Sequence, residues 1–193
     1  MPTTFQHIPL LFTPAETAKI TGVSERSQRN WRARGFLKPL PPGKHFRADV
    51  FDLSVLVVAN LISDRLPVEK SVAWAHLCAK RVAYHALCQT SAWTDLHVGF
   101  DFPHFLRHQA GRAVADHFEE TIRVIPAQYF FLWADGTELW DVDLNSAFEN
   151  ATPSQLRGAV LVLDLNHLGQ ELLDRQKPLM RLARTDTSLE SGE

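Results

Sequence analysis

The sequence has few cysteines, and this limits the covalent chemistry that it can support. Its 193 residues include only two, Cys78 and Cys88. They lie ten positions apart on a predicted helical stretch, which would separate them by roughly 15 Å at 1.5 Å per residue. Because a disulfide needs α-carbons within about 7 Å of each other, we expect two buried thiols and no redox pair.

Long hydrophobic runs are also absent. No apolar run approaches the roughly 20 residues that a helix needs to cross a bilayer, and the N-terminus lacks the charged region and apolar core of a signal peptide. We therefore expect a cytoplasmic protein. A hydrophobic content of 45% with 22% charged residues is ordinary for a globular chain, but residues 185–193 are polar and acidic and predict a disordered tail.

Patterns that mark catalytic or metal sites are missing as well. The chain has no Ser/His/Asp or Cys/His arrangement, no glycine-rich phosphate loop and no zinc-ligand motif. His104 and His108 are four residues apart and could share a helical face as metal ligands do, but no glutamate stands where a zinc protease needs one. Asp141 and Asp143 would alternate onto one strand face, usually the solvated one. The sequence thus predicts no enzyme, no catalytic residue, no metal and no cofactor.

Charges of both signs are present, but they are unevenly distributed along a chain of formal net charge −2. Residues 1–48 contain eight Lys and Arg against two Asp and Glu, a net of +6, whereas residues 49–193 contain twelve against twenty, a net of −8. Such segregation indicates a polyanion-binding head on a body with a different task. An acidic body would also repel a DNA duplex and leave only the head to dock.

The basic head contains the signals of a helix-turn-helix unit. Thr13 can cap a helix that opens on a proline, and Glu16 can complete a capping box. Gly22 can end that helix with a positive φ, and Ser24 can cap a second helix that stops at Gly35. Two short helices joined by a turn with a glycine are the layout of DNA-binding helix-turn-helix units.

The second helix would be the one that reads DNA. Arginine favours guanine, and glutamine or asparagine, such as Asn30, favours adenine. We expect Trp31 to anchor the helix in the core. The proline- and glycine-rich residues 36–47 predict a β-wing that can reach backbone phosphate. The predicted DNA-binding residues of the helix and the wing are Ser24, Arg26, Ser27, Gln28, Arg29, Arg32, Lys44, His45 and Arg47.

Several short motifs stand in a characteristic order between residues 9 and 65. They are Phe12-Thr13-Pro14-Ala15-Glu16, Thr21-Gly22-Val23-Ser24, Arg26 with Arg29, Gly35-Phe36-Leu37-Lys38-Pro39, and Phe46-Arg47 before a helix start at Asp49. In order and spacing they resemble the winged helix-turn-helix of the mercury-resistance regulator (MerR) family, and phage excisionases share the same general design. The resemblance implies binding to double-stranded DNA. It does not extend to metal or drug sensing, because the chain shows no long coiled-coil helix.

The rest of the chain predicts an α+β fold. Residues 68–89 have an apolar stripe of helical period, and this helix would pack on the winged domain or pair with its twin in a dimer. A further helix is expected over residues 105–120. Alternating or apolar runs over residues 122–133 and 137–144 flank an Asp-Gly dipeptide, which is a strong hairpin signal.

The last predicted elements are a strand and a helix. Residues 158–165 form a continuous apolar run that suits a central, doubly covered strand, and Asn166 could cap a helix after it. We therefore predict four regions. They are a winged helix-turn-helix domain over residues 1–66, a helical linker or dimerisation region over 67–121, a small α+β domain over 122–184, and the tail over 185–193.

The function expected from these features is that of a sequence-specific DNA-binding transcriptional regulator. One winged unit buries roughly 600–1,000 Å², so action as a homodimer is expected. The C-terminal domain would supply dimerisation, ligand response or contact with a protein partner. The alternatives are an architectural or recombination factor of the excisionase type, an antitoxin or anti-activator that binds a partner protein, and an enzyme that the head targets to DNA.

Overall fold

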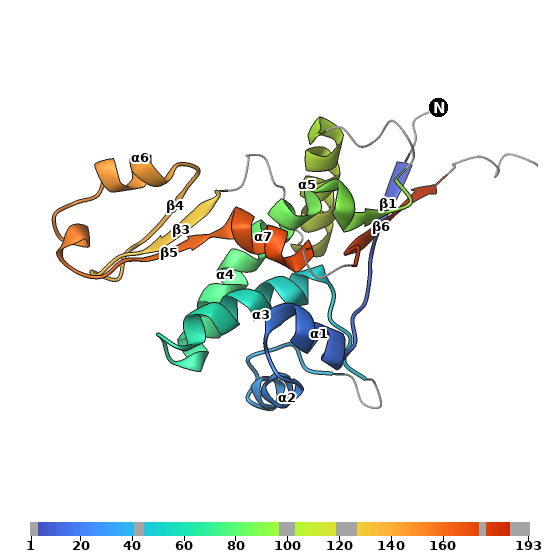
Figure 1. Cartoon of the computed structure of the whole chain (residues 1–193), viewed down its shortest axis with the longest axis horizontal. Coiled ribbons are helices and arrows are strands. Elements are labelled where there is room, and N and C mark those ends of the chain that lie inside the picture. The colour runs from blue at the N-terminus through green and yellow to red at the C-terminus, as the bar shows by residue number, and fades with distance from the viewer. Residues whose placement is uncertain (1–3, 41–44, 97–102, 119–126, 174–176, 186–193) are drawn as a thin grey trace, which may run out of the picture.

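The computed structural model describes residues 4–40, 45–96, 103–118, 127–173 and 177–185. It shows a mixed α+β fold, which confirms the predicted class. Helices form the centre of the molecule, and two small sheets lie on opposite sides of them (Figure 1).

The two N-terminal helices and their turn form where the sequence predicts them. Helix α1 (Pro14–Thr21) begins at Thr13, whose hydroxyl accepts from the Glu16 N–H while the Glu16 carboxylate accepts from the Thr13 N–H. This is the expected capping box. The helix ends at Gly22, which has a φ of 76°, and helix α2 (Glu25–Ala33) follows.

The predicted wing is not a hairpin in the part of it that the structure describes. Residues 36–40 and 45–47 form no strand, and residues 41–44 lie outside the described ranges. The segment instead closes on one antiparallel bridge, in which Phe12 and Ala48 exchange backbone hydrogen bonds of 2.8 and 3.0 Å. The segment after α2 therefore comes back to lie beside Phe12, just before the next helix begins at Val50.

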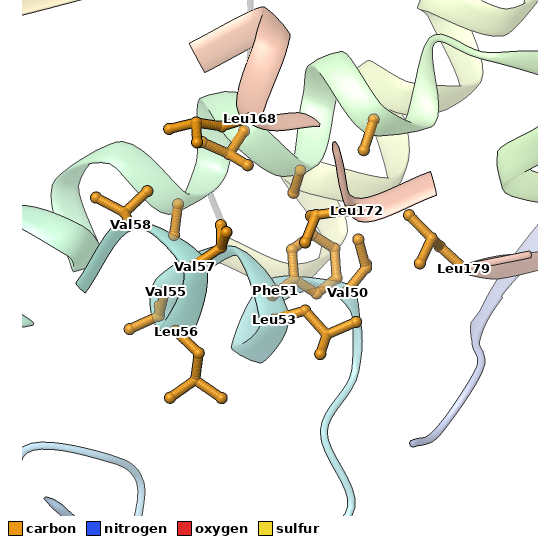
Figure 2. Packing of buried hydrophobic residues seen from close by; sticks show 14 of the residues in the cluster. Val50, Phe51, Leu53, Val55, Leu56, Val57, Val58, Leu168, Leu172 and Leu179 are labelled. Carbon is orange, nitrogen blue, oxygen red and sulfur yellow. The ribbon is translucent and has the colours of Figure 1, made fainter. Parts of the chain in front are cut away.

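Three helices make the centre. Asp49 caps α3 (Val50–Ser63), as expected, and Asp52 completes a second capping box that the sequence did not predict. Helix α3 packs along α4 (Val68–Leu87), which matches the helix predicted over residues 68–89. Helix α7 (Leu165–Leu173) packs on both. Figure 2 shows two leucines of α7 directed toward the row of apolar α3 side chains. Because α3 is apolar on nearly all sides, it needs cover from several neighbours.

The first sheet joins the two ends of the chain. Strand β1 (Thr4–Pro9) pairs antiparallel with β6 (Met180–Thr185), and β2 (Trp93–Thr94) pairs parallel with β6 on its other side. Helix α5 (Pro103–Phe118) lies beside this sheet (Figure 1). None of these three strands is predicted by the sequence pattern.

The second sheet extends away from the helices (Figure 1). Its order is β4 (Glu138–Asp141), β3 (Tyr129–Leu132) and β5 (Leu161–Asp164), with antiparallel pairing throughout. The predicted hairpin at Asp135-Gly136 joins β3 to β4, and Gly136 has a φ of 83°. A short helix α6 (Leu144–Glu149) and two 3-10 turns complete the fold, at Thr90–Ala92 and Gln155–Arg157.

The structure corrects three predictions in this region. Strand β5 is an edge strand and not a central one, because β3 takes the central position. Helix α7 begins at Leu165, and Asp164 rather than Asn166 supplies its cap by accepting from the His167 N–H at 2.9 Å. Asp143 lies beyond β4 and caps α6, so it does not share a strand face with Asp141.

One continuous apolar core crosses the predicted domain boundaries after residues 66 and 121. Its buried residues extend from Phe12 in the head to Leu182 in β6. The second sheet contributes one face, with Phe130 and Leu163, to this core. Its other face forms a small separate cluster around Phe131. The head and the rest of the chain thus share one apolar core.

Both cysteines are free, Cys78 buried in α4 and Cys88 partly buried after it. Burial raises the pKa of the Cys78 thiol to about 12 and also raises that of Cys88. These thiols therefore stay protonated at neutral pH. The expected burial is confirmed for Cys78 and is only partial for Cys88.

Candidate nucleic-acid interface

Helix α2 has a buried face and a charged face. Gln28 and Trp31 point inward and are 0% and 8% exposed, which confirms the anchoring role predicted for Trp31. Arg26, Arg29 and Asn30 are exposed. In Figure 1 this helix lies outside α1 and α3, at the edge of the molecule. Since residues three and four apart share a helical face, these three side chains form one polar row on the uncovered side.

The start of α2 is closed by two serines. The Ser24 hydroxyl accepts from the Ser27 N–H at 3.1 Å, and the two hydroxyls lie 2.9 Å apart. Ser24 therefore acts as the predicted N-cap. An exposed cap at a helix N-terminus also places backbone N–H groups where a phosphate can approach, which keeps both serines compatible with the predicted DNA contact.

Gln28 is a correction to the predicted set of DNA-binding residues. Its side-chain amide donates to the backbone oxygens of Pro14 and Val23, at 3.1 and 2.9 Å. Both amide protons are used inside the head, and the side chain has no exposed surface. Gln28 therefore fastens α2 to α1 and to the turn, and it is not placed to read a base.

Arg32, a predicted DNA-binding residue, packs against an aromatic ring within the head. Its guanidinium carbon lies 3.3 Å from the centre of the Phe46 ring, and its Nε and Nη2 atoms are buried without a hydrogen-bond partner. Burial lowers the pKa of Arg32, while the charge of Asp52 in α3 acts in the opposite direction. Arg32 thus connects α2 to the segment that leads into α3.

Two of the remaining predicted contacts flank Phe46, whose ring packs against Arg32 of α2. His45 and Arg47 are exposed, whereas Lys44 lies outside the described residues. Two further exposed cations, Arg34 and Lys38, were not in the predicted set. Arg34 caps the C-terminal end of α2 and stacks 4.5 Å from the Phe36 ring centre. Only their positive charge could have identified them from the sequence.

The C-terminal end of α2 is held by a glycine motif and by the body. Gly35 has a φ of 75°, and the Phe36 N–H returns to the Trp31 oxygen at 2.9 Å, as in a Schellman motif. The Phe36 oxygen in turn lies 3.2 Å from Nε2 of His76 in α4. The exposed arginines are therefore presented by a helix that is fixed at both ends.

An ion pair joins the first helix of the head to a residue near the C-terminal end of the chain. The Lys177 ammonium contacts the Glu16 carboxylate. This contact and the bonds to Thr13 lower the pKa of Glu16 to about 2. Because Glu16 also closes the α1 capping box, a residue distant in sequence supports the local cap.

The arrangement can bind a polyanion. Arg26, Arg29 and Arg34 offer planar forks of N–H donors, which match phosphate oxygens and the guanine edge. Among the described residues of α2, Glu25 is the only carboxylate. A helix with this charge, fixed at both ends, is suited to lie against the backbone and bases of a duplex.

Comparisons with protein-family models, curated proteins and solved structures found no match to this chain. No helix in the described ranges combines the length and apolarity that a bilayer span requires. Among the residues that the structure places, no three His, Cys, Asp or Glu side chains are grouped so as to hold a metal ion. His104 and His108 are exposed on α5.

Proposed function

We propose that this protein is a sequence-specific DNA-binding transcriptional regulator that acts in the cytoplasm as a homodimer. The observation that carries the proposal is the exposed row of Arg26, Arg29 and Asn30 on α2. That helix follows a capped first helix and a turn at Gly22. The MerR-like order of motifs in the head supports the same proposal.

The roles within this interface differ. Arg29 and Asn30 lie at the C-terminal end of the exposed row and are proposed to contact base edges. Arg47 and His45, which flank Phe46, are proposed to contact backbone phosphates. Phosphate contacts position a protein on any duplex, whereas base contacts distinguish one sequence from another.

The direct experiment is selection of bound duplexes from a random pool, followed by anisotropy titrations of the selected and a scrambled duplex at several salt concentrations. A specific binder of this kind prefers the selected duplex by roughly 10³ or more. Enrichment of no sequence, or equal affinity for both duplexes, would contradict the proposal.

Two variants separate the proposed roles. Arg29→Ala should weaken binding to the selected duplex by about 1–3 kcal/mol and have little effect on the scrambled one. Arg47→Ala should weaken both about equally and reduce the salt dependence by about one counterion. Arg157→Ala, at an exposed arginine near the second sheet, is the matched control and should change neither.

The dimer is tested by the mass of the particle, from light scattering of the free protein and of its complex with the selected duplex. A dimer on two half-sites predicts recognition helices about 34–36 Å apart and two chains per duplex. One chain per duplex would contradict the dimer and leave the DNA-binding proposal intact.

A further inference from the structure

A hollow of about 300 Å³ lies between the helical body and the second sheet. Helix α4 contributes four lining residues, α5 contributes Phe118 at its end, and β4 contributes Glu138 and Trp140. The four on α4 are His76, Leu77, Lys80 and Arg81. It is separate from the exposed row of α2 and takes no part in the proposed DNA contact. Its volume is at the lower end of the range for small-molecule sites, about 300–1,000 Å³.

The lining combines positive charge with apolar surface. Among the described lining residues, Lys80 and Arg81 are cationic and Glu138 is anionic. The Arg81 guanidinium carbon lies 3.7 Å from the centre of the Trp140 ring, which orients its planar donor fork. Leu77 is 47% exposed and lines the hollow with Phe118 and Trp140. A ligand that covered it would remove apolar area from water.

We propose that this hollow binds a small, flat carboxylate, with the anionic group toward Lys80 and Arg81 and the apolar body against Leu77 and Phe118. A neutral molecule of the same shape would bury the same apolar surface without the charge-assisted hydrogen bonds that a carboxylate accepts from Lys and Arg. The size of the hollow suits about one fused pair of aromatic rings.

One residue of the hollow also contacts the segment that ends helix α2. His76 lines it and lies 3.2 Å from the Phe36 oxygen, and the Phe36 N–H closes the last turn of α2 on Trp31. A ligand that moves the His76 ring therefore changes the contact that holds the end of α2. This coupling, which rests on the proposed DNA-binding function, makes the bound carboxylate an effector.

The first test is isothermal titration of the full chain with naphthalene carboxylate and with its neutral carboxamide. We expect the carboxylate to bind at least about tenfold more tightly than the carboxamide. Lys80→Glu should remove that preference, and Lys70→Glu, at an exposed lysine of the same helix outside the hollow, should keep it. Leu77→Trp, which fills the hollow, should abolish binding of both compounds. No binding to the wild type, equal binding of the two compounds, or an unchanged preference in Lys80→Glu would overturn the site.

The second test repeats the carboxylate titration in the presence of the selected duplex. Coupling predicts that the duplex changes the affinity for the carboxylate by about 5-fold or more, and that the carboxylate changes the affinity for the duplex by the same factor. His76→Ala should reduce this factor toward one. Equal carboxylate affinity with and without the duplex would overturn the effector role. Carboxylate binding by a protein that selects no DNA sequence would support the site and contradict only the proposed DNA-binding function.

Discussion

Gly169 in α7 lies against the backbone of Ala86 in α4 so closely that a Cβ on Gly169 would stand 2.7 Å from the Ala86 nitrogen. The same Cβ would stand 2.8 Å from the Val82 oxygen. Real side chains essentially never approach backbone atoms to this distance. The absence of a side chain at Gly169 therefore allows α7 to cross α4, and this crossing brings the C-terminal part of the chain onto the centre of the fold.

Gly169→Ala is expected to destabilise the protein, because the two helices must separate to admit the methyl group. Overpacking of this kind costs about 1–3 kcal/mol. Gly111→Ala is the matched control. Gly111 lies within α5 with no atom near its Cβ position, and alanine in place of glycine in a helix should stabilise by about 0.5–1 kcal/mol. Urea unfolding of both variants measures the two effects, and destabilisation of equal size in both would contradict the close crossing.

Gln28→Ala should destabilise the head, because the backbone oxygens of Pro14 and Val23 would lose their buried donors. The expected cost is about 1–3 kcal/mol. Asn30→Ala changes an exposed side chain on the same helix and should change the free energy of unfolding by less than about 0.5 kcal/mol. Thermal unfolding by circular dichroism compares the two. A large loss of stability in Asn30→Ala with none in Gln28→Ala would reverse the assignment of the buried and exposed faces of α2.

Asp52 should make the stability depend on pH. Burial, together with the negative charge of Asp49, raises the pKa of Asp52 from 3.8 to about 6. The folded state then holds this proton more tightly than the unfolded state. The contribution of Asp52 to stability is therefore largest below pH 3.8 and is lost as the pH rises to about 6.

Asp52→Asn removes this titration while keeping an oxygen that can accept from the Asp49 N–H. We expect the free energy of unfolding of the wild type, relative to Asp52→Asn, to fall by on the order of 2 kcal/mol between pH 4 and pH 7. Urea unfolding at several pH values measures the difference. A difference that is constant with pH, or that grows as the pH rises, would contradict the raised pKa.

A fragment that ends at residue 66 should not fold cooperatively. It would lose α4 and α7, which cover α3, and it would lose β6, the partner of β1. Helix α3 is buried on nearly all sides in the whole chain, so the loss of α4 and α7 would leave part of its apolar surface in water. Circular dichroism with thermal unfolding tests this expectation. A fragment with a sharp transition near that of the full chain would instead show that the head is an independent domain.

Sequence patterns predicted the elements whose signals are local. Thr13, Ser24 and Asp49 were recognised as helix caps, and Gly22 and Gly136 as turn residues, because each acts on backbone atoms within a few positions of itself. The order of the helices in the head and the hairpin at Asp135-Gly136 followed from these signals. Most of the exposed charges of α2 could likewise be identified, since charged side chains rarely enter a core.

The errors came from contacts between distant segments. Gln28 is a residue type that can read a base edge, but its side-chain amide donates instead to the backbone oxygens of Pro14 and Val23. Residues 161–164 have the apolar character of a central strand, but they lie at a sheet edge. Glutamine is found both on surfaces and in cores, and an apolar strand is found both at the centre and at the edge of a sheet. Only the contacts with distant parts of the chain decide which environment each one has.

The sequence by itself determined the helix boundaries of the head, the capped turn between its helices, and the concentration of positive charge near α2, because these depend on short-range backbone chemistry and composition. The tertiary structure alone decided which polar residues of α2 face solvent, that β1 pairs with β6, and that Gly169 permits α7 to cross α4. These outcomes depend on surfaces that meet only when remote segments pack. A local residue pattern indicates the secondary structure of its own segment, but it does not indicate which remote segment will pack against it.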